Sequence, residues 1–170
     1  MIIGDTGCRL KDKGLSGEYQ NCSNLKEWPF ATVLKQIEKE KADLLIHLGD
    51  FHYREQCSND KNCEVYSPVV GYEWKPWELD FFLPMDSLFY KMPLIIVRGN
   101  HEDCKRAFLG YKNYLKNESW NEECKAIETS QIVTFSKFAI LNIDSSAIDD
   151  KPELSSEIEN KYVTEFEKID

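Results

Sequence analysis

Three short polar clusters hold the side chains of this sequence that could do chemistry. Asp5 stands in the first cluster, Asp50 and Tyr53 in the second, and Asn100 and His101 in the third. Carboxylate, phenol and carboxamide oxygens, together with imidazole, suit hard, oxygen-preferring divalent and trivalent cations. Two such ions about 3.5 to 4 Å apart can share one carboxylate between them. The clusters therefore indicate a two-metal site, in which Asp50, from the middle cluster, is the candidate bridge.

Each cluster directly follows a short apolar run that predicts a buried strand. The runs cover 1–3, 44–48 and 94–97. A single Gly-Asp or Gly-Asn pair is commonly a turn, but three polar clusters in order, each after an apolar run, are hard to attribute to turns. Open α/β sheets bind their ligands beyond the carboxyl ends of the strands. We therefore expect the three clusters to meet at one edge of a sheet.

The spacing of apolar residues between the clusters predicts the elements that must position them. Apolar residues at helical intervals predict helices that open at Pro29, run over 77–91 and 105–115, and end the chain. Two further strands are predicted at 132–135 and 138–143, joined by a hairpin or tight bend. The first strand, the helix after Pro29 and the second strand form a βαβ unit, which should be right-handed. The predicted fold is α/β, with a central mixed or mostly parallel sheet flanked by helices.

Composition limits the classes of function. The 170 residues, 42% of them hydrophobic, can bury one core, and a second domain is not expected. The net charge is −9 and there is no run of basic residues, so the positive face that a nucleic-acid backbone requires is missing. No apolar stretch approaches the roughly 20 residues that cross a bilayer. We therefore expect neither nucleic acid nor a membrane as a partner, and no pattern indicates an oligomeric state.

The six cysteines predict disulfide bonds close to the polar clusters. Six cysteines allow 15 connectivities, of which we prefer the one that joins sequence neighbours. The preferred pairs are Cys8 with Cys22, Cys57 with Cys63, and Cys104 with Cys124. Each pair would close a loop that follows one of the three motif strands. The alternative is six reduced thiols in a cytosolic protein, whereas disulfides would indicate a secreted or periplasmic one.

The three clusters resemble the signature blocks of a known family. As they stand here, GDTG, GDFHY and GNHE are similar to the first three blocks of the calcineurin-like metallophosphoesterase superfamily. Many members carry a histidine two residues after the first aspartate. Gly7 occupies that place here, and Tyr53 resembles the tyrosine ligand of the purple-acid-phosphatase branch. The longer stretches GDTGCR, HYRE, WxxDFF and RGNHExC further resemble a bacterial secreted group. The likeness covers about residues 1–146 and implies a four-layer αββα sandwich.

This resemblance implies a metal-binding role for four residues. Asp5 and Tyr53 would bind the first metal, Asp50 would bridge, and Asn100 would bind the second. A phenol ionises readily only against strong positive charge, so the tyrosine ligand favours a trivalent first ion. The implied cofactors are therefore iron(III) together with zinc, manganese or iron(II). The implied reaction is hydrolysis of a phosphate-ester substrate by a metal-bound hydroxide.

The resemblance also implies roles around the metals. His101 would contact the phosphoryl oxygen or protonate the leaving alkoxide, and Glu102 would orient it. His52 and Arg54 flank Tyr53 and could contact phosphate, or they could be ordinary surface residues. In the same region, Arg98 is expected to pair with an acid, while Asp144 could support the site or cap a turn.

The family completes its metal site with two later histidine blocks that this chain lacks. Its histidines are His47, His52 and His101, and His47, inside an apolar strand, is expected to be a core residue. The available ligands leave two ions undercoordinated. We therefore expect residues 1–170 to be the N-terminal part of a single metallophosphoesterase domain that continues beyond 170, with a clipped first strand, and such a fragment need not be active alone. The competing hypothesis is a catalytically degenerate member that serves as a binding or structural module.

Overall fold

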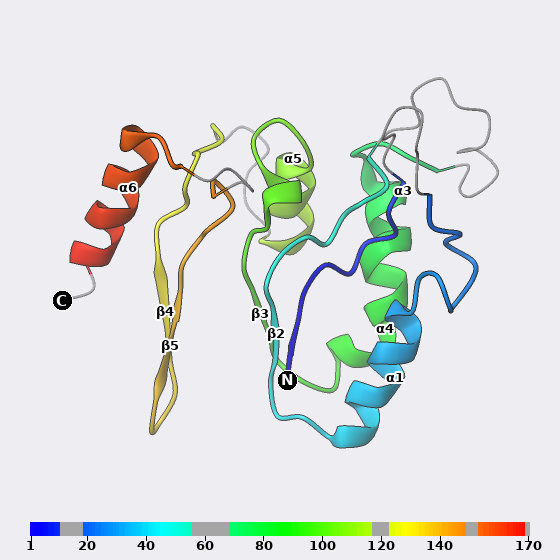
Figure 1. The fold of residues 1–170 in the computed structure, drawn as a ribbon. Coiled ribbons are helices and arrows are strands. Elements are labelled where there is room, and N and C mark those ends of the chain that lie inside the picture. The colour runs from blue at the N-terminus through cyan, green and yellow to red at the C-terminus, as the bar shows by residue number, and fades with distance from the viewer. Residues whose placement is uncertain (11–18, 56–68, 117–122, 149–152, 169–170) are drawn as a thin grey trace.

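A three-stranded parallel sheet organises the protein in this computed structural model, which describes residues 1–10, 19–55, 69–116, 123–148 and 153–168 (Figure 1). The strands are β1 (Ile2–Ile3), β2 (Leu45–His47) and β3 (Leu94–Ile96). Their order is β1-β2-β3, so the second motif strand lies between the other two. Ile46 is the register partner of Ile2 on one side and of Ile95 on the other. The predicted parallel sheet is confirmed, and all three strands end at the same edge.

The helices follow the predicted order, with two shifts in their starts. They are α1 (Phe30–Glu40), the continuous run of α3 (Trp74–Trp77), η2 (Glu78–Phe82) and α4 (Leu83–Phe89), the pair α5 (Phe108–Gly110) and η4 (Tyr111–Leu115), and α6 (Ser156–Glu167). The second helix begins three residues before the predicted start, because proline is tolerated in its first turn at Pro76. The third begins three residues late, because Asp103 accepts the backbone N–H of Lys105 in a turn. No helix among these elements is long and apolar enough to span a membrane, within the described ranges.

The core lies where α1 and the run from α3 to α4 cover the sheet. Figure 1 shows α1 and α4 side by side, and the two helices contact each other. The helices contribute buried aliphatic and aromatic side chains to one cluster with Phe51 of the second motif loop, and these are Phe30, Leu34, Ile37, Trp77, Phe81, Met85 and Leu88. The loop that carries Asp50 is therefore anchored in the core by the side chain that follows it.

The second sheet is the predicted hairpin. It consists of β4 (Gln131–Thr134) and β5 (Ala139–Asn142), which pair antiparallel. The Asn142 side chain donates to the Ile96 carbonyl at 2.8 Å and so connects the hairpin to the end of β3. Figure 1 shows α6 beyond the hairpin, on the side away from the parallel sheet.

His47 is a core histidine, as predicted. It is fully buried, and its ring stacks on Phe51 with centroids 3.9 Å apart. The Gly49 N–H donates to Nδ1 at 3.2 Å, so Nε2 carries the hydrogen and donates to Thr6 Oγ1 at 2.8 Å. Burial lowers the pKa of His47 to about 3. The imidazole is therefore neutral and connects the first two motif loops.

The neutral state of His47 predicts a pH dependence of stability. Because the pKa falls from 6.5 in the unfolded chain to about 3 in the folded protein, the unfolded state binds a proton first as pH falls. The contribution of neutral His47 to the free energy of unfolding is complete above pH 6.5. It is lost as pH falls toward 3, at up to about 1.4 kcal/mol per pH unit. Urea unfolding of the metal-free protein should show a steeper pH dependence for the wild type than for His47→Gln. Equal slopes above about pH 5 would contradict this expectation, because the wild type and the variant share every other titrating group.

Candidate metal centre

The first two polar clusters are aligned by backbone hydrogen bonds between their loops. The Asp5 N–H donates to the Gly49 carbonyl at 3.1 Å, and the Thr6 N–H donates to the Asp50 carbonyl at 3.0 Å. Asp5 and Asp50 both have left-handed backbone conformations, with φ of 53° and 58°. Side chains other than glycine adopt this region at an energetic cost, and such residues concentrate at functional sites. The strain therefore falls on the two candidate carboxylate ligands.

The Tyr53 hydroxyl lies between these two carboxylates. It is 2.7 Å from Asp5 Oδ1 and 2.8 Å from Asp50 Oδ2. Burial raises the pKa of Tyr53, and the hydrogen bond to Asp5 and the charge of Asp50 raise it further. Three oxygens thus share one phenol hydrogen. A cation at the same place would favour the phenolate instead, because positive charge stabilises the ionised form.

Asp50 contacts the third cluster with its other oxygen. Its Oδ1 accepts the His101 backbone N–H at 3.0 Å. The Asn100 amide nitrogen, in the orientation that satisfies its hydrogen bonds, lies 3.2 and 3.0 Å from the two Asp50 oxygens. A half-turn of that amide presents its oxygen, the ligand atom that a cation needs. The structure therefore brings Asp5, Asp50, Tyr53 and Asn100 together around one carboxylate.

The donor set of this centre fits hard cations. It consists of two carboxylates, a phenol and a carboxamide, all of them oxygen donors. No group of three or more His, Cys, Asp or Glu side chains in the described part of the chain could hold a metal. Only Asp5 and Asp50 of the four residues belong to those types, and Tyr53 and Asn100 add a phenol and a carboxamide oxygen. The four residues fit the metals in chemistry but supply few ligands for two ions.

Glu102 holds the second motif loop through its backbone. The carboxylate is fully buried and accepts the N–H groups of Asp50, Phe51, His52 and Gly99 at 2.9 to 3.1 Å. Burial, followed by the charge of Asp50, raises the pKa of Glu102 to about 8, and these N–H groups oppose the rise. The resemblance assigned Glu102 to orienting His101. Its observed partners are instead the backbone groups around Asp50.

The partner of the His101 ring is a residue that the sequence did not single out as a site residue. His101 Nδ1 lies 2.6 Å from Glu55 Oε1, and both side chains are about one-tenth exposed. Arg106 Nη1 lies 3.6 Å from the same Glu55 oxygen. The His101 ring also packs on Tyr53, with centroids 3.9 Å apart. The signal in the sequence was the HYRE stretch, where Glu55 follows Tyr53 by two residues.

His52 and Arg54 lie in the core beside Asp80. His52 is fully buried, its Nε2 lies 2.7 Å from the Gly71 carbonyl, and its Nδ1 lies 3.5 Å from Asp80. Arg54 donates from Nε to Asp80 Oδ1 at 2.5 Å. The prediction that they could be ordinary surface residues is wrong, because both side chains are buried beside the Asp80 carboxylate. Their polar groups are directed to Asp80 and Gly71.

Arg98 and Asp144 form a buried ion pair at 2.5 Å. Arg98 also donates to the Lys125 and Ala126 carbonyls, and Asp144 accepts the Ser146 N–H at 2.9 Å. The predicted pairing of Arg98 with an acid is confirmed, as is the turn-capping alternative for Asp144. Together they connect the end of β3 to the segments before β4 and after β5.

Two of the predicted disulfides are present. They join Cys8 to Cys22 and Cys104 to Cys124, with Cα atoms 5.7 and 5.6 Å apart. Each closes a loop that directly follows a motif cluster. The predicted pair of Cys57 and Cys63 lies outside the described residues.

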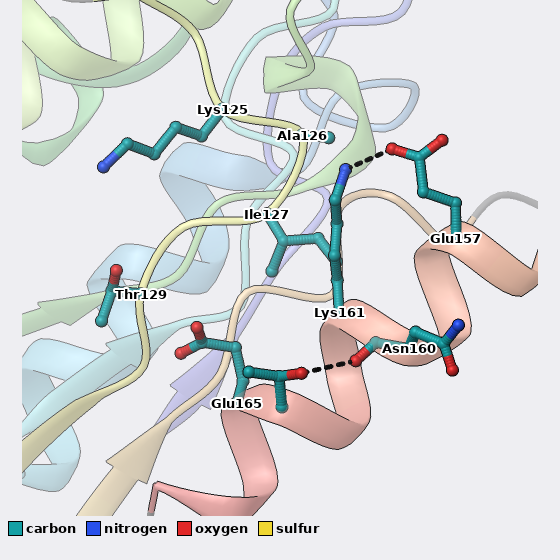
Figure 2. Close-up of a pocket in the computed structure, with 9 residues that line it drawn as sticks. Lys125, Ala126, Ile127, Thr129, Glu157, Asn160, Lys161 and Glu165 are labelled. Carbon is teal, nitrogen blue, oxygen red and sulfur yellow. Dashed lines mark hydrogen bonds and ion pairs between the residues drawn. The ribbon is translucent and has the colours of Figure 1, made fainter.

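A separate cavity lies between the segment before β4 and α6 (Figure 2). Its volume is about 600 Å³, and residues 125–127 and Thr129 line it together with α6. Figure 2 shows the Lys161–Glu157 ion pair, which is 2.7 Å long, among its lining residues. None of the residues of the three clusters lines this cavity. It is therefore not part of the candidate metal centre.

Comparison with known proteins assigns the family. The family model for calcineurin-like phosphoesterase matches residues 1–166. No curated protein and no solved structure gave a significant match to the chain. The chain therefore belongs to the calcineurin-like phosphoesterase family, whose members are generally metal-dependent enzymes that act on phosphate esters. The superfamily resemblance of the three clusters is confirmed.

Gly7 offers a test of how closely the first loop approaches Tyr53. A Cβ atom at Gly7 would lie 2.6 Å from the Tyr53 nitrogen and 2.9 Å from the Phe51 carbonyl oxygen, and neither backbone atom can yield easily. We expect Gly7→Ala to lower the free energy of unfolding by about 1–3 kcal/mol, which chemical denaturation would measure. Gly4→Ala is the matched control, because its Cβ would meet Leu48 at an ordinary 3.4 Å. Equal stability of the two variants would contradict the close approach.

Proposed function

We propose that this protein hydrolyses phosphate esters at a dinuclear metal centre to which Asp5, Asp50, Tyr53 and Asn100 contribute ligands. The observation that carries the proposal is the position of Asp50, whose two oxygens contact Tyr53 on one side and the Asn100 loop on the other. A carboxylate with partners on both sides is suited to bridge two ions. Membership in a metal-dependent phosphoesterase family supports the same chemistry.

The ligands divide between the two ions by their contacts. Asp5 and Tyr53 would hold the first ion, since the Tyr53 hydroxyl lies 2.7 Å from Asp5 Oδ1. Asn100 would hold the second ion. Tyr53 favours iron(III) at the first position, because its buried phenol needs strong positive charge to ionise. Zinc, manganese or iron(II) suits the carboxamide side. When bound, the two ions would supply positive charge to the phosphoryl oxygens and acidify a water.

His101 is the proposed proton donor to the leaving alkoxide. Its Nδ1 faces Glu55 at 2.6 Å, which leaves Nε2 as the nitrogen available to a substrate. A cavity of about 260 Å³ beside Asn100 offers room for the leaving group, and Arg106, Ser146 and Ala147 are among its lining residues. Glu55 would hold the imidazole in orientation.

We also propose that the protein works in an oxidising compartment, as a secreted or periplasmic protein. Two disulfides support this proposal, one after the first cluster and one after the third. Disulfides persist in such compartments and are rare in the cytosol.

Turnover of an aryl phosphate by the full-length, metal-loaded protein tests the proposed function. Asp50→Asn should lower kcat by more than the roughly 10–100-fold typical of outer-shell changes, because it removes charge from both ions. Chelation should abolish turnover and metal should restore it. Lys161→Ala is the control, because that exposed side chain lies on α6 away from the clusters. Metal binding without turnover in the wild type would instead favour the degenerate binding module.

Glu55 can be tested through the leaving group. If Glu55 holds His101 as a proton donor, Glu55→Gln should lower kcat for alkyl phosphates by about 10–100-fold. The loss should be smaller for aryl phosphates, since their good leaving groups need less proton transfer, and KM should change little. Equal losses for both substrate types would contradict a role in proton transfer.

A further inference from the structure

Asp80 is a buried carboxylate in an unusual helical segment. It is fully buried in the π-helical stretch η2, which interrupts the helical run between α3 and α4. Burying a charged carboxylate is costly unless donors surround it. Short π-helical segments are rare and occur frequently at functional sites. The burial of Asp80 and the π-helical geometry around it are two independent indications that this side chain has a specific role.

The partners of Asp80 are backbone groups of the first two motif loops. Its Oδ2 accepts the Tyr53 N–H at 2.9 Å and the Arg54 N–H at 3.2 Å. Its Oδ1 accepts the Cys8 N–H at 3.2 Å and the Arg54 Nε–H at 2.5 Å. The Asp80 carboxylate thus joins the backbone of Cys8, in the loop that carries Asp5, to the backbone of Tyr53, which carries the phenol.

A second set of contacts returns from Arg54 to the first loop. The Arg54 guanidinium lies over the Trp28 ring, 5.5 Å from its centroid. The Trp28 indole N–H in turn donates to the Thr6 carbonyl at 2.8 Å, next to Asp5. A further backbone hydrogen bond joins the same two loops, because the Leu10 N–H donates to the Tyr53 carbonyl at 3.0 Å. The relative position of the two loops is therefore determined at several points around Asp80.

We propose that Asp80 is a positioning residue for the first metal ion. By holding the backbone of Tyr53 and Cys8 together, it sets the 2.7 Å approach of the Tyr53 hydroxyl to Asp5. Asp80 would touch neither metal nor substrate, and its effect would reach the ion through these two ligands. The inference rests on the proposed function for the identity of the ligands, and it goes beyond that proposal by assigning the helical run a role in metal affinity.

Asp80→Asn is the direct test, because it keeps the size but replaces one acceptor oxygen with an NH₂ group that faces N–H donors. The metal-free full-length protein would be titrated with Fe³⁺ and with Zn²⁺, each in competition with a chelator of known affinity, while near-ultraviolet difference absorption reports ionisation of tyrosine. The binding step that loses this signal in Tyr53→Phe is the first ion. We expect Asp80→Asn to weaken that step by about 10–100-fold and to leave the other step within about 3-fold.

Leu88→Ala is the matched control. Leu88 lies in α4, in the same helical run, and is a buried member of the apolar core. Leu88→Ala should lower the unfolding midpoint and leave both metal-binding steps unchanged. If Asp80→Asn does not fold, Arg54→Gln replaces it, because that variant removes the side-chain bond to Asp80 and keeps the backbone bonds. A smaller but selective loss in the first step is then expected.

The outcomes separate this inference from the proposed function. An unchanged first step in Asp80→Asn, or in Arg54→Gln where that variant replaces it, would overturn the positioning role, and so would equal losses in both steps. A wild type that binds neither Fe³⁺ nor Zn²⁺ would overturn the proposed metal centre and the positioning role with it. Selective loss of the first step with the wild-type phosphatase activity absent would support the positioning role and count against the proposed reaction.

Discussion

Five consecutive backbone N–H groups, from residue 50 to residue 54, donate to two buried carboxylates. Glu102 accepts the first three and Asp80 the last two. A loop that leaves a strand with Asp50 in a left-handed conformation cannot satisfy these donors within itself, and a buried N–H without a partner is costly. The second motif loop is therefore held from the third loop on one side and from the helical run on the other.

This arrangement organises the candidate centre without a metal. The loop that the two carboxylates hold carries both Asp50 and Tyr53. The Tyr53 hydroxyl lies within hydrogen-bond distance of Asp5 and Asp50, at the place where positive charge would be favoured. Sites whose ligands are held by packed, hydrogen-bonded surroundings lose little freedom when they bind. The backbone strain at Asp5 and Asp50 is consistent with a loop whose shape is imposed by these contacts.

The regular elements could be predicted because their signals are local. The apolar runs before each cluster predicted the parallel sheet, helical spacing after Pro29 predicted α1, and the two short apolar segments near 131–142 predicted the hairpin. The π-helical stretch from Glu78 could not be predicted, because its apolar spacing matches an ordinary helix. The partners of Asp80 in this stretch are residues distant in sequence, such as Cys8, and local apolar spacing carries no information about them.

The sequence by itself determined the chemistry available to this protein: carboxylate, phenol and carboxamide groups after three strands, their order and the family. It also predicted the two disulfide pairs that the structure describes. Those properties follow from residue types and short spacings, which the chain carries locally. Only the tertiary structure decided that Glu55 faces His101, that Glu102 holds the backbone around Asp50, and that Arg54 pairs with Asp80. These pairings join residues 26 or more positions apart. A buried charge selects its partner by proximity in the folded core, which local sequence does not specify.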